Sequence, residues 1–405
     1  MAAKQWIGAL HHRNFRVFFI GQTASQVGTG MLPVALSFAV LEHGTASDVG
    51  FVFAAQLLPL VLFLLVGGVL ADRLNRRRVM LGSDLLRFVA EAVLAVWILV
   101  ATPPLWGFLV LVACVGVGEA FFTPAMTGLV PQILEAEHLQ QGNALTGLAE
   151  SGGGIVGPAA AGVIVATSSP GWAVLADAAT YLVSVISLAL VRADWSSVRP
   201  TDRFLVLLRE GWRQFWSRTW LWVIVVQASV VNVLVFAPYF VLGPAVAKEQ
   251  LGGAAAWGLV LTALGVGAVL GGVVMLRVHV RHPLRVAMLT GFTWAIPLVA
   301  MATARSTVVI AVGSFLGGVS MSVFGALWNT TMQREVPDEV LSRVSAYDWF
   351  GSLVFLPIGM AVVGPLAAAL GTATVLVACA VCTVALTGIT LSVPAVYRLR
   401  APDPA

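Results

Sequence analysis

Long uninterrupted apolar runs dominate this sequence of 405 residues. Each run extends for about 20 residues or more, and a helix that rises 1.5 Å per residue crosses a hydrocarbon core of about 30 Å over such a length. Hydrophobic residues make up 59% of the chain and charged residues 10%, far from the usage of soluble domains. Segments of about 10 residues with alternating polarity, typical of membrane β-barrels, do not occur. We therefore expect an all-α polytopic membrane protein.

The apolar runs predict twelve transmembrane helices in two six-helix bundles. The predicted spans are 14–41, 48–71, 79–101, 105–130, 143–167, 172–191, 219–246, 255–276, 284–303, 306–331, 346–369 and 372–396. The expected domains are residues 1–192 and 219–405, joined by a cytoplasmic linker, residues 193–218. Apolar side chains at helical spacing between arginines in 201–218 predict an amphipathic helix on the inner membrane surface.

The basic residues are distributed unevenly along this arrangement. Of 23 Lys and Arg residues, twenty fall on the side of the two termini, Lys248 and Arg305 fall on the other side, and Arg87 lies within a span. This positive-inside bias predicts a multi-pass protein of the cytoplasmic (inner) membrane with both termini in the cytoplasm. The net charge of +4 thus reflects topology, and no nucleic-acid partner is expected.

The two sets of six spans share short matches in register, which favours a duplicated architecture. The matches, at offsets of 202 to 207 positions, are Gly68, Arg73 and Arg77 with Gly272, Arg277 and Arg281, Glu137 with Glu339, and Gly157-Pro158 with Gly364-Pro365. An even number of spans per half gives corresponding helices the same orientation, so we expect the halves to be related by an axis along the membrane normal.

Neither the cysteines nor the histidines indicate a cofactor. Cys114, Cys379 and Cys382 lie in apolar runs, so the CxxC of the last two is interpreted as packing rather than redox chemistry. All six histidines fall in predicted loops or termini, so no metal site is expected. No nucleophile and base are recognisable, and we do not expect an enzyme. The first run is too long for a cleavable signal peptide, so the first helix is expected to direct its own insertion.

The turn after the second predicted helix concentrates charge in the order Gly68, Asp72, Arg73, Asn75 and Arg77. On charge alone, these residues fit a topogenic cluster. Their order resembles the signature G-x-x-x-D-R-x-G-R-R/K of the major facilitator superfamily, with Asn75 in place of the glycine. The resemblance extends over the whole chain and implies a transporter in which Asp72 bonds at the cytoplasmic gate and Arg73 and Arg77 join its charge network.

The fifth predicted helix contains a run of small residues around Gly153, Gly157, Pro158 and Gly162. This run resembles the antiporter motif G-x-x-x-G-P-x-x-G-G of drug exporters, with Ala161 at one glycine position. A glycine face permits tight packing, which we expect across the interface of the two halves, and Pro158 bends the helix. The same residues also fit an ordinary GxxxG packing face.

A narrower resemblance points to the drug:proton antiporter branch that includes macrolide-efflux and enterobactin-export proteins. It rests on Arg13-Asn14-Phe15-Arg16 followed by Gln22, and on Phe122-Thr123-Pro124-Ala125. Related exporters have an arginine in the fourth helix where this chain has Val112, so that residue's role in proton relay is not carried over.

Ionisable residues inside spans are costly, at about 2.5–3.5 kcal/mol each near the helix centre, and each needs an explanation. Asp84, Arg87 and Glu91 fall at i, i+3 and i+7 on one helix face, which predicts an ion pair between Arg87 and one of the acids. Glu91 lies deeper in the span. Asp177 and Asp348 lie near predicted helix ends, where capping or interfacial exposure explains them.

Glu119 lies near the middle of the fourth predicted helix with no cation within one turn. A carboxyl group in that position can carry a proton during transport, or it can be a protonated group that hydrogen bonds to another helix. Glu91 and Glu150 are the next candidates for proton coupling.

Polar side chains on the first and seventh predicted helices complete a candidate substrate cavity at mid-membrane depth. Gln22 and Gln26 share one face, as do Asn232, Phe236 and Tyr239 around Pro238. These groups would orient a largely apolar solute, and each is equally compatible with interhelical packing.

Together these features predict a secondary active transporter, a proton-coupled efflux protein for small, largely apolar compounds that works by alternating access. Its expected partners are a small-molecule substrate, protons and the lipid bilayer, and we expect a monomer. An importer, a uniporter or a non-transporting membrane receptor or scaffold are the alternatives. The antiporter-like run disfavours import, and the acids within spans would have no role in a scaffold.

Overall fold

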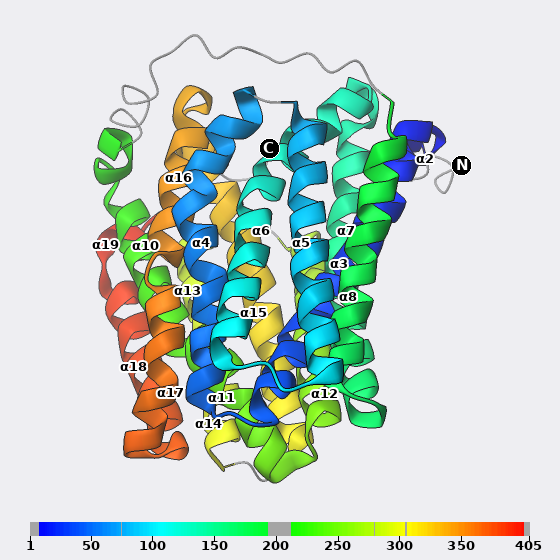
Figure 1. The fold of residues 1–405 in the computed structure, drawn as a ribbon. Coiled ribbons are helices and arrows are strands. Elements are labelled where there is room, and N and C mark those ends of the chain that lie inside the picture. Colours follow the sequence, from blue (N-terminus) through cyan, green and yellow to red (C-terminus); the bar gives the residue numbers. More distant parts are fainter. Residues whose placement is uncertain (1–7, 74, 193–211, 279, 304–305, 401–405) are drawn as a thin grey trace. The chain divides into compact units, whose positions relative to one another are not determined.

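The computed structural model describes residues 8–73, 75–192, 212–278, 280–303 and 306–400. The chain divides into two compact units, residues 1–200 and 201–405, and each is a bundle of long helices (Figure 1). The described residues contain no strand. The all-α prediction is therefore confirmed, while most of the predicted linker and its amphipathic helix lie outside the described residues.

The described residues of the first unit form six long helices and two short ones. They are α2 (Gly8–His11), α3 (Arg13–Leu41), α4 (Ala46–Arg73), α5 (Arg76–Val100), α6 (Leu105–Ile133), the 3₁₀ turn η1 (Ala136–His138), α7 (Leu139–Thr167) and α8 (Pro170–Leu190). Asn75 caps α5, because its side-chain oxygen accepts a hydrogen bond from the backbone N–H of Arg78 at 3.2 Å. The asparagine at the signature's glycine position thus begins the third membrane helix.

The helices of the second unit are more often interrupted. They are α10 (Thr219–Val231), the π-helix η2 (Asn232–Phe236), α11 (Ala237–Val246), the π-helix η3 (Ala247–Leu251), α12 (Ala254–Met275), α13 (Pro283–Gly291), the 3₁₀ turn η4 (Phe292–Trp294), α14 (Ala295–Thr303), α15 (Thr307–Glu335), α16 (Asp338–Leu353), α17 (Leu356–Leu370), α18 (Thr372–Ser392) and α19 (Pro394–Tyr397).

Eleven helical stretches of the described residues are long and apolar enough to cross a membrane. The predicted span that is absent from this set is α5, which has 25 residues but carries Asp84, Arg87 and Glu91 in its central part. Its length corresponds to about 37 Å, enough to cross a bilayer, and it packs against α6 and α8. The count of twelve spans therefore depends on how α5 accommodates its charges.

The two units repeat one pattern of helix packing. In each, the second long helix packs on the fourth, and the third packs on the fourth and sixth. Gly116 of α6 lies against the backbone of Gln56 in α4, and Gly318 of α15 lies against the backbone of Leu264 in α12. A Cβ atom at either glycine would collide with main-chain atoms, so the same close approach occurs between equivalent helices.

Two predicted spans are less regular than expected. The predicted helix 219–246 contains η2 directly before Pro238, and the predicted helix 346–369 is divided between α16 and α17 before Pro357. Proline has no N–H to donate and crowds the preceding turn, which explains both interruptions. The side-chain amide of Asn232 donates to the carbonyl of Ser352 at 2.7 Å, so the two irregular regions contact each other.

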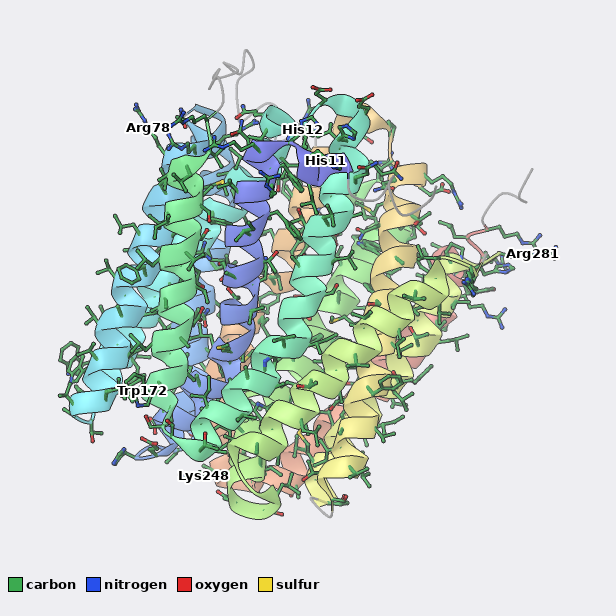
Figure 2. The ribbon with its side chains drawn as sticks, turned by 90° about the vertical axis from the view of Figure 1, so that its right-hand side faces the viewer. His11, His12, Arg78, Trp172, Lys248 and Arg281 are labelled. Atoms are coloured by element: carbon green, nitrogen blue, oxygen red, sulfur yellow. The ribbon has the colours of Figure 1, made fainter. Side chains whose placement is uncertain are left out.

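Charged and aromatic side chains mark the ends of each unit. In the first unit His11, His12 and Arg78 lie at one end and Trp172 lies at the other, and in the second unit Arg281 and Lys248 lie at opposite ends (Figure 2). Many leucine, valine and isoleucine side chains between these ends are exposed. An apolar outer surface of this kind suits a lipid solvent.

Candidate functional site

Two polar stripes face each other inside the first unit, one on α5 and one on α8. Asp84 of α5 accepts a hydrogen bond from the hydroxyl of Ser184 in α8 at 2.6 Å. One helical turn further, the guanidinium of Arg87 lies 4.5 Å from the ring centre of Tyr181. The polar residues of α8, Asp177, Tyr181 and Ser184, have the spacing i, i+4 and i+7. This spacing complements that of Asp84, Arg87 and Glu91 on α5, which is i, i+3 and i+7. These two successive contacts join the two helices, and the spacing leaves room for a third.

Arg87 is the cation of this site. It forms a buried ion pair with Asp84, as its spacing predicted. Phe122 of α6 lies on its guanidinium at 4.4 Å, so the cation is held between two aromatic rings. Its Nε atom is buried and has no hydrogen-bond partner in the part of the chain that the structure describes. Arg87 therefore has unused hydrogen-bonding capacity inside the helix bundle.

The third contact between the stripes joins two acids, Glu91 of α5 and Asp177 of α8. Their exposed fractions are 1% and 0%. Among the described residues, neither carboxyl oxygen of Glu91 has a hydrogen-bond partner, nor does Oδ2 of Asp177. The hydroxyl of Thr180 lies 3.4 Å from Oδ1 of Asp177. The capping interpretation of Asp177 is wrong, because α8 begins at Pro170 with Ser169 as its N-cap and the aspartate lies two turns inside.

Glu119 lies on α6 and contributes a further acid to the same region. Its carboxyl group is partly buried and interacts electrostatically with Arg87. The prediction found no cation near Glu119 on its own helix, and the structure supplies one from α5. Gly118 makes this approach possible, because a Cβ atom there would collide with the side chain of Arg87.

These side chains form what we call the acid cluster: Asp84, Arg87, Glu91, Glu119 and Asp177. Four carboxyl groups surround one guanidinium, so full ionisation would leave three uncompensated negative charges in a region of low dielectric constant. Such a charge is avoided when the cluster binds protons. The acid cluster therefore gathers more acidic groups than its one cation can balance within the first unit.

The glycines of α7 lie against α3 of the same unit. A Cβ atom at Gly153 would collide with the backbone at Gln26, and one at Gly157 would collide with the backbone at Val27 and Gly30. Pro158 and Gly162 are also buried. The atoms that crowd Gly153 and Gly157 thus belong to α3 of the same unit, and packing of this run across the halves stays a prediction. Glu150 of α7 is exposed, in contrast to the buried Glu91 and Asp177.

The gate signature is described in part. Gly68, Asp72 and Arg73 belong to the backbone of α4, but their side chains lie outside what the structure describes. Arg77 donates from Nε to the carbonyl of Leu188 at 2.7 Å and from Nη2 to that of Ala189 at 2.6 Å. A cation at the carboxyl end of α8 is favoured by the helix dipole. The described contacts of Arg77 thus join the start of α5 to the end of α8.

The substrate-cavity candidates lie in two different environments. In the first unit Gln22 is buried, and its Oε1 atom has no hydrogen-bond partner within the described ranges; Gln26 is partly buried. In the second unit Tyr239 is fully buried and its hydroxyl lies 2.8 Å from Oγ of Ser314. This geometry favours the packing interpretation for Tyr239.

Asn232 and Phe236 lie at the two ends of η2, and both are partly exposed. The ring of Phe236 lies 4.9 Å from that of Trp294. A π-helix of this kind often marks a functional position in a helix. These two residues therefore remain the better candidates for contact with a solute in the second unit.

Asp348 corrects a second interpretation of an acid. It lies inside α16 and accepts a hydrogen bond from the indole N–H of Trp328 at 2.9 Å, with Ser352 at 3.5 Å. It is therefore neither a cap nor an exposed interfacial residue. Both carboxyl oxygens have a protein partner, in contrast to those of Glu91.

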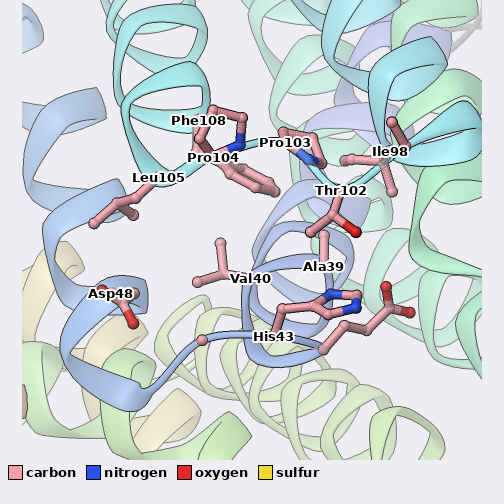
Figure 3. A pocket seen from close by; sticks show the side chains of 13 residues that line it. Ala39, Val40, His43, Asp48, Ile98, Thr102, Pro103, Pro104, Leu105 and Phe108 are labelled. Carbon is pink, nitrogen blue, oxygen red and sulfur yellow. The ribbon is translucent and has the colours of Figure 1, made fainter.

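A cavity of about 280 Å³ lies at the end of the first unit where α3 and α5 finish and α6 begins (Figure 3). Val40, Thr102 and Phe108 line it, together with the polar side chains of His43 and Asp48. The carboxylate of Asp48 accepts two hydrogen bonds from Thr45 at 2.8 Å. This cavity is separate from the acid cluster. Among the described residues, no group of three or more His, Cys, Asp or Glu side chains could hold a metal ion.

Long apolar helices in two bundles, repeated packing and a cluster of buried acids around one arginine are typical of a polytopic membrane transporter. The chain belongs to the Major Facilitator Superfamily, whose family profile matches residues 18–352.

Three similar proteins carry names that describe export. The multidrug efflux pump Tap of Mycolicibacterium fortuitum is 29% identical over 88% of this chain and 89% of its own length. The macrolide efflux protein A of Streptococcus pyogenes is 23% identical over 85% of this chain and 87% of its own. The enterobactin exporter EntS of Salmonella choleraesuis is 27% identical over 88% of this chain and 86% of its own length.

Solved structures show the same fold. A mutant of the nucleoside transporter NupG aligns with a TM-score of 0.77 at 11% identity over 94% of this chain and 99% of that chain. A POT family transporter aligns with a TM-score of 0.75 at 11% identity over 94% of this chain and 95% of that chain.

Proposed function

We propose that this chain is a proton-coupled exporter of small, largely apolar compounds. It resides in the cytoplasmic membrane with both termini in the cytoplasm, and it works as a monomer by alternating access between its two halves. Protons that flow inward drive the solute outward, since each charge that crosses about 100 mV supplies about 2.3 kcal/mol.

The observation that carries this proposal is the charge balance of the acid cluster. Four carboxyl groups share one buried cation, and ionisable groups in a membrane span are costly unless they have a role. A uniporter or a scaffold needs no such group. The predicted carriers Glu119 and Glu91 belong to the cluster, whereas the exposed position of Glu150 supports it less.

The relatives support export as the direction of transport. The printed names of the three curated relatives refer to multidrug efflux, macrolide efflux and enterobactin export. Their alignments extend over more than four fifths of both chains, so the likeness covers both bundles. We take small, largely apolar compounds as the substrate class, because the candidate contact residues Asn232 and Phe236 combine one amide group with an aromatic ring.

The test uses purified protein in sealed vesicles with an imposed pH gradient and two probes, ethidium and a radiolabelled macrolide. Antiport predicts that vesicles with an acidic interior accumulate the probe, because protons leave as the probe enters. This expectation holds for either orientation of the protein in the vesicle. Nigericin, which collapses the pH gradient, should abolish the accumulation.

Three other outcomes would point elsewhere. Accumulation only with an alkaline interior would indicate proton symport, and uptake that ignores the gradient would indicate a uniporter. If vesicles with the protein accumulate no more of either probe than protein-free vesicles do, in any gradient, the proposal is contradicted for this substrate class.

A further inference from the structure

We propose that Glu91 of α5 and Asp177 of α8 hold the coupled proton together: the pair releases one proton and retains a second as a hydrogen bond between the two carboxyl groups. This inference rests on proton coupling as the proposed function and names the groups that carry it out. It differs from the sequence-based prediction, in which Glu119 was the first candidate.

The pair stands apart from the other contacts that join α5 and α8. Asp84 meets a hydroxyl group and Arg87 meets an aromatic ring, and each of these contacts is satisfied by complementary chemistry. Glu91 instead meets another acid. Two carboxylates in contact would repel each other, so at least one of them must hold a proton for the helices to pack as they do.

The carboxyl oxygens of the pair lack other partners. Both oxygens of Glu91 and Oδ2 of Asp177 are buried without a hydrogen-bond donor among the described residues. A carboxylate is an acceptor only, whereas a carboxylic acid also donates one hydrogen bond. One proton placed between the groups therefore turns two unsatisfied acceptors into a donor and an acceptor. No side chain other than these two acids is needed to satisfy the contact.

The charged and titratable groups that face the pair determine what happens when it loses a proton. Arg87 approaches from α5, Glu119 from α6 and Tyr181 from α8. From α3 come Gly28 and Thr29, which carry no charge. Because Arg87 is the nearby cation and its Nε has no partner, it can stabilise the negative charge that remains after one proton leaves.

The proton balance is therefore simple. With two protons the pair is neutral, and after release of one proton it carries a single negative charge and one shared hydrogen bond. The ion pair of Arg87 with Asp84 persists through this step, so the net charge of the acid cluster changes by one. Loss of both protons would place two adjacent carboxylates beside one guanidinium, which the low dielectric constant disfavours.

Gly28 of α3 is part of this arrangement. A Cβ atom at Gly28 would collide with Oδ1 of Asp177 and with the hydroxyl of Thr180. The carboxyl group of Asp177 therefore lies directly against the α3 backbone, and a change in the pair acts on α3, α5 and α8 together. Glu119 lacks a comparable contact, because it is partly exposed and interacts with the cluster through Arg87.

The experiment compares infrared difference spectra of purified protein in lipid nanodiscs as pH is raised. The readout is the C=O band of protonated carboxyl groups. A shared proton predicts that Glu91→Gln and Asp177→Asn each remove the same titrating band, and that the double variant removes no more than either single variant. If the two single variants instead remove two different bands, and the double variant removes both, the two acids do not share a proton.

Two further variants control for folding and for the nature of the substitution. The exchange Glu91→Asp with Asp177→Glu keeps two acids in contact and should restore the titrating band. Asp348→Asn makes the same chemical change at a partly buried acid whose oxygens both have protein partners, and it should leave the band in place. Absence of the band from the exchanged variant, at unchanged monodispersity, would count against the pair.

Transport by the same proteins separates this inference from the proposed function. Uphill probe accumulation should fall at least tenfold in Glu91→Gln and Asp177→Asn, while exchange without a gradient persists. Full accumulation in both variants would contradict the proposal that Glu91 and Asp177 share the coupled proton, and it would make Glu119 the candidate carrier. A wild-type protein that ignores the gradient would refute the proposed function, whereas the spectra would still decide whether the two acids share a proton.

Discussion

Arg87 contacts three helices at once, and its removal should affect the first unit as a whole. Its guanidinium pairs with Asp84 and lies between the rings of Phe122 and Tyr181. When one partner of a buried ion pair is deleted, the other remains as an uncompensated charge, which costs about 3–5 kcal/mol. Stability should therefore depend on Arg87 more than on any exposed arginine.

We expect Arg87→Met to lower the free energy of unfolding of the detergent-purified protein by about 3–5 kcal/mol, measured as a shift of its unfolding transition. Methionine fills a similar volume, so the change tests charge rather than packing. Adding Asp84→Asn should recover most of the loss, because asparagine still accepts the hydrogen bond from Ser184. Equal stability of the wild type and Arg87→Met would contradict a structural role for this ion pair.

The residues of the acid cluster were predictable to different degrees. The ion pair of Asp84 and Arg87 followed from their spacing on one helix, because neighbours at i and i+3 meet on any helix. The partnership of Glu91 with Asp177 did not, since it depends on how α5 and α8 pack. A signal existed in the polar stripe of Asp177, Tyr181 and Ser184 within an apolar helix. Its distance from the predicted helix end was too short to separate capping from burial.

At the scale of helices, backbone contacts at glycine determine which pairs can approach closely. Gly157 of α7 lies so near α3 that a Cβ atom would come within 2.5 Å of the carbonyl of Val27 and 2.6 Å of the Gly30 backbone. Main-chain atoms cannot rotate away as side chains do. A single methyl group at this position must therefore separate the two helices.

Gly157→Ala should lower the unfolding temperature of the purified protein and destabilise it by about 1–3 kcal/mol. The matched control is Gly152→Ala on the same helix, where a Cβ atom meets nothing within 4 Å. Alanine favours helix over glycine by about 1 kcal/mol, so the control should be neutral or more stable. Similar melting of both variants would show that the α3 contact does not limit stability.

Helix bounds were predicted well where apolar runs end in polar loops. The predicted span 105–130 corresponds to Leu105–Ile133, and 172–191 corresponds to Pro170–Leu190. The interruptions of the second unit were not predicted, because a hydropathy pattern does not distinguish an α-helix from a π-helix. The start of α16 at Asp338 was also missed, since its first two turns are polar. Hydrophobic composition indicates which segments lie in lipid. It does not indicate whether their backbone hydrogen bonds follow the α-helical or the π-helical pattern.

At the scale of the whole molecule, the distribution of basic residues makes a prediction about sidedness. Lys248 and Arg281 lie at opposite ends of the second unit (Figure 2). In a variant without native cysteines, a membrane-impermeant thiol reagent applied to intact cells should label Lys248→Cys and spare Arg281→Cys. Both positions should react after the cells are permeabilised. Labelling of Arg281→Cys in intact cells would reverse the topology.

The transporter family and the fold class were predictable from the sequence, because both are indicated by motifs and apolar runs that recur along the whole chain. The substrate was not, since solute contacts depend on a few side chains whose arrangement no periodic pattern specifies. Asn232 and Phe236 illustrate this limit. Their spacing identified a shared face, while the π-helix that presents them became evident only in the structure.

The charges of α5 also have a consequence for how the protein is made. Its three ionisable side chains near the helix centre cost about 2.5–3.5 kcal/mol each when charged, so α5 partitions poorly into lipid by itself. Ser184, which bonds to Asp84, lies 100 residues further along the chain. A ribosome that adds about 5–20 residues per second needs about 5–20 s to supply it. During that interval α5 must wait beside the translocon or at the membrane surface, so correct assembly of the acid cluster depends on the order and pace of synthesis.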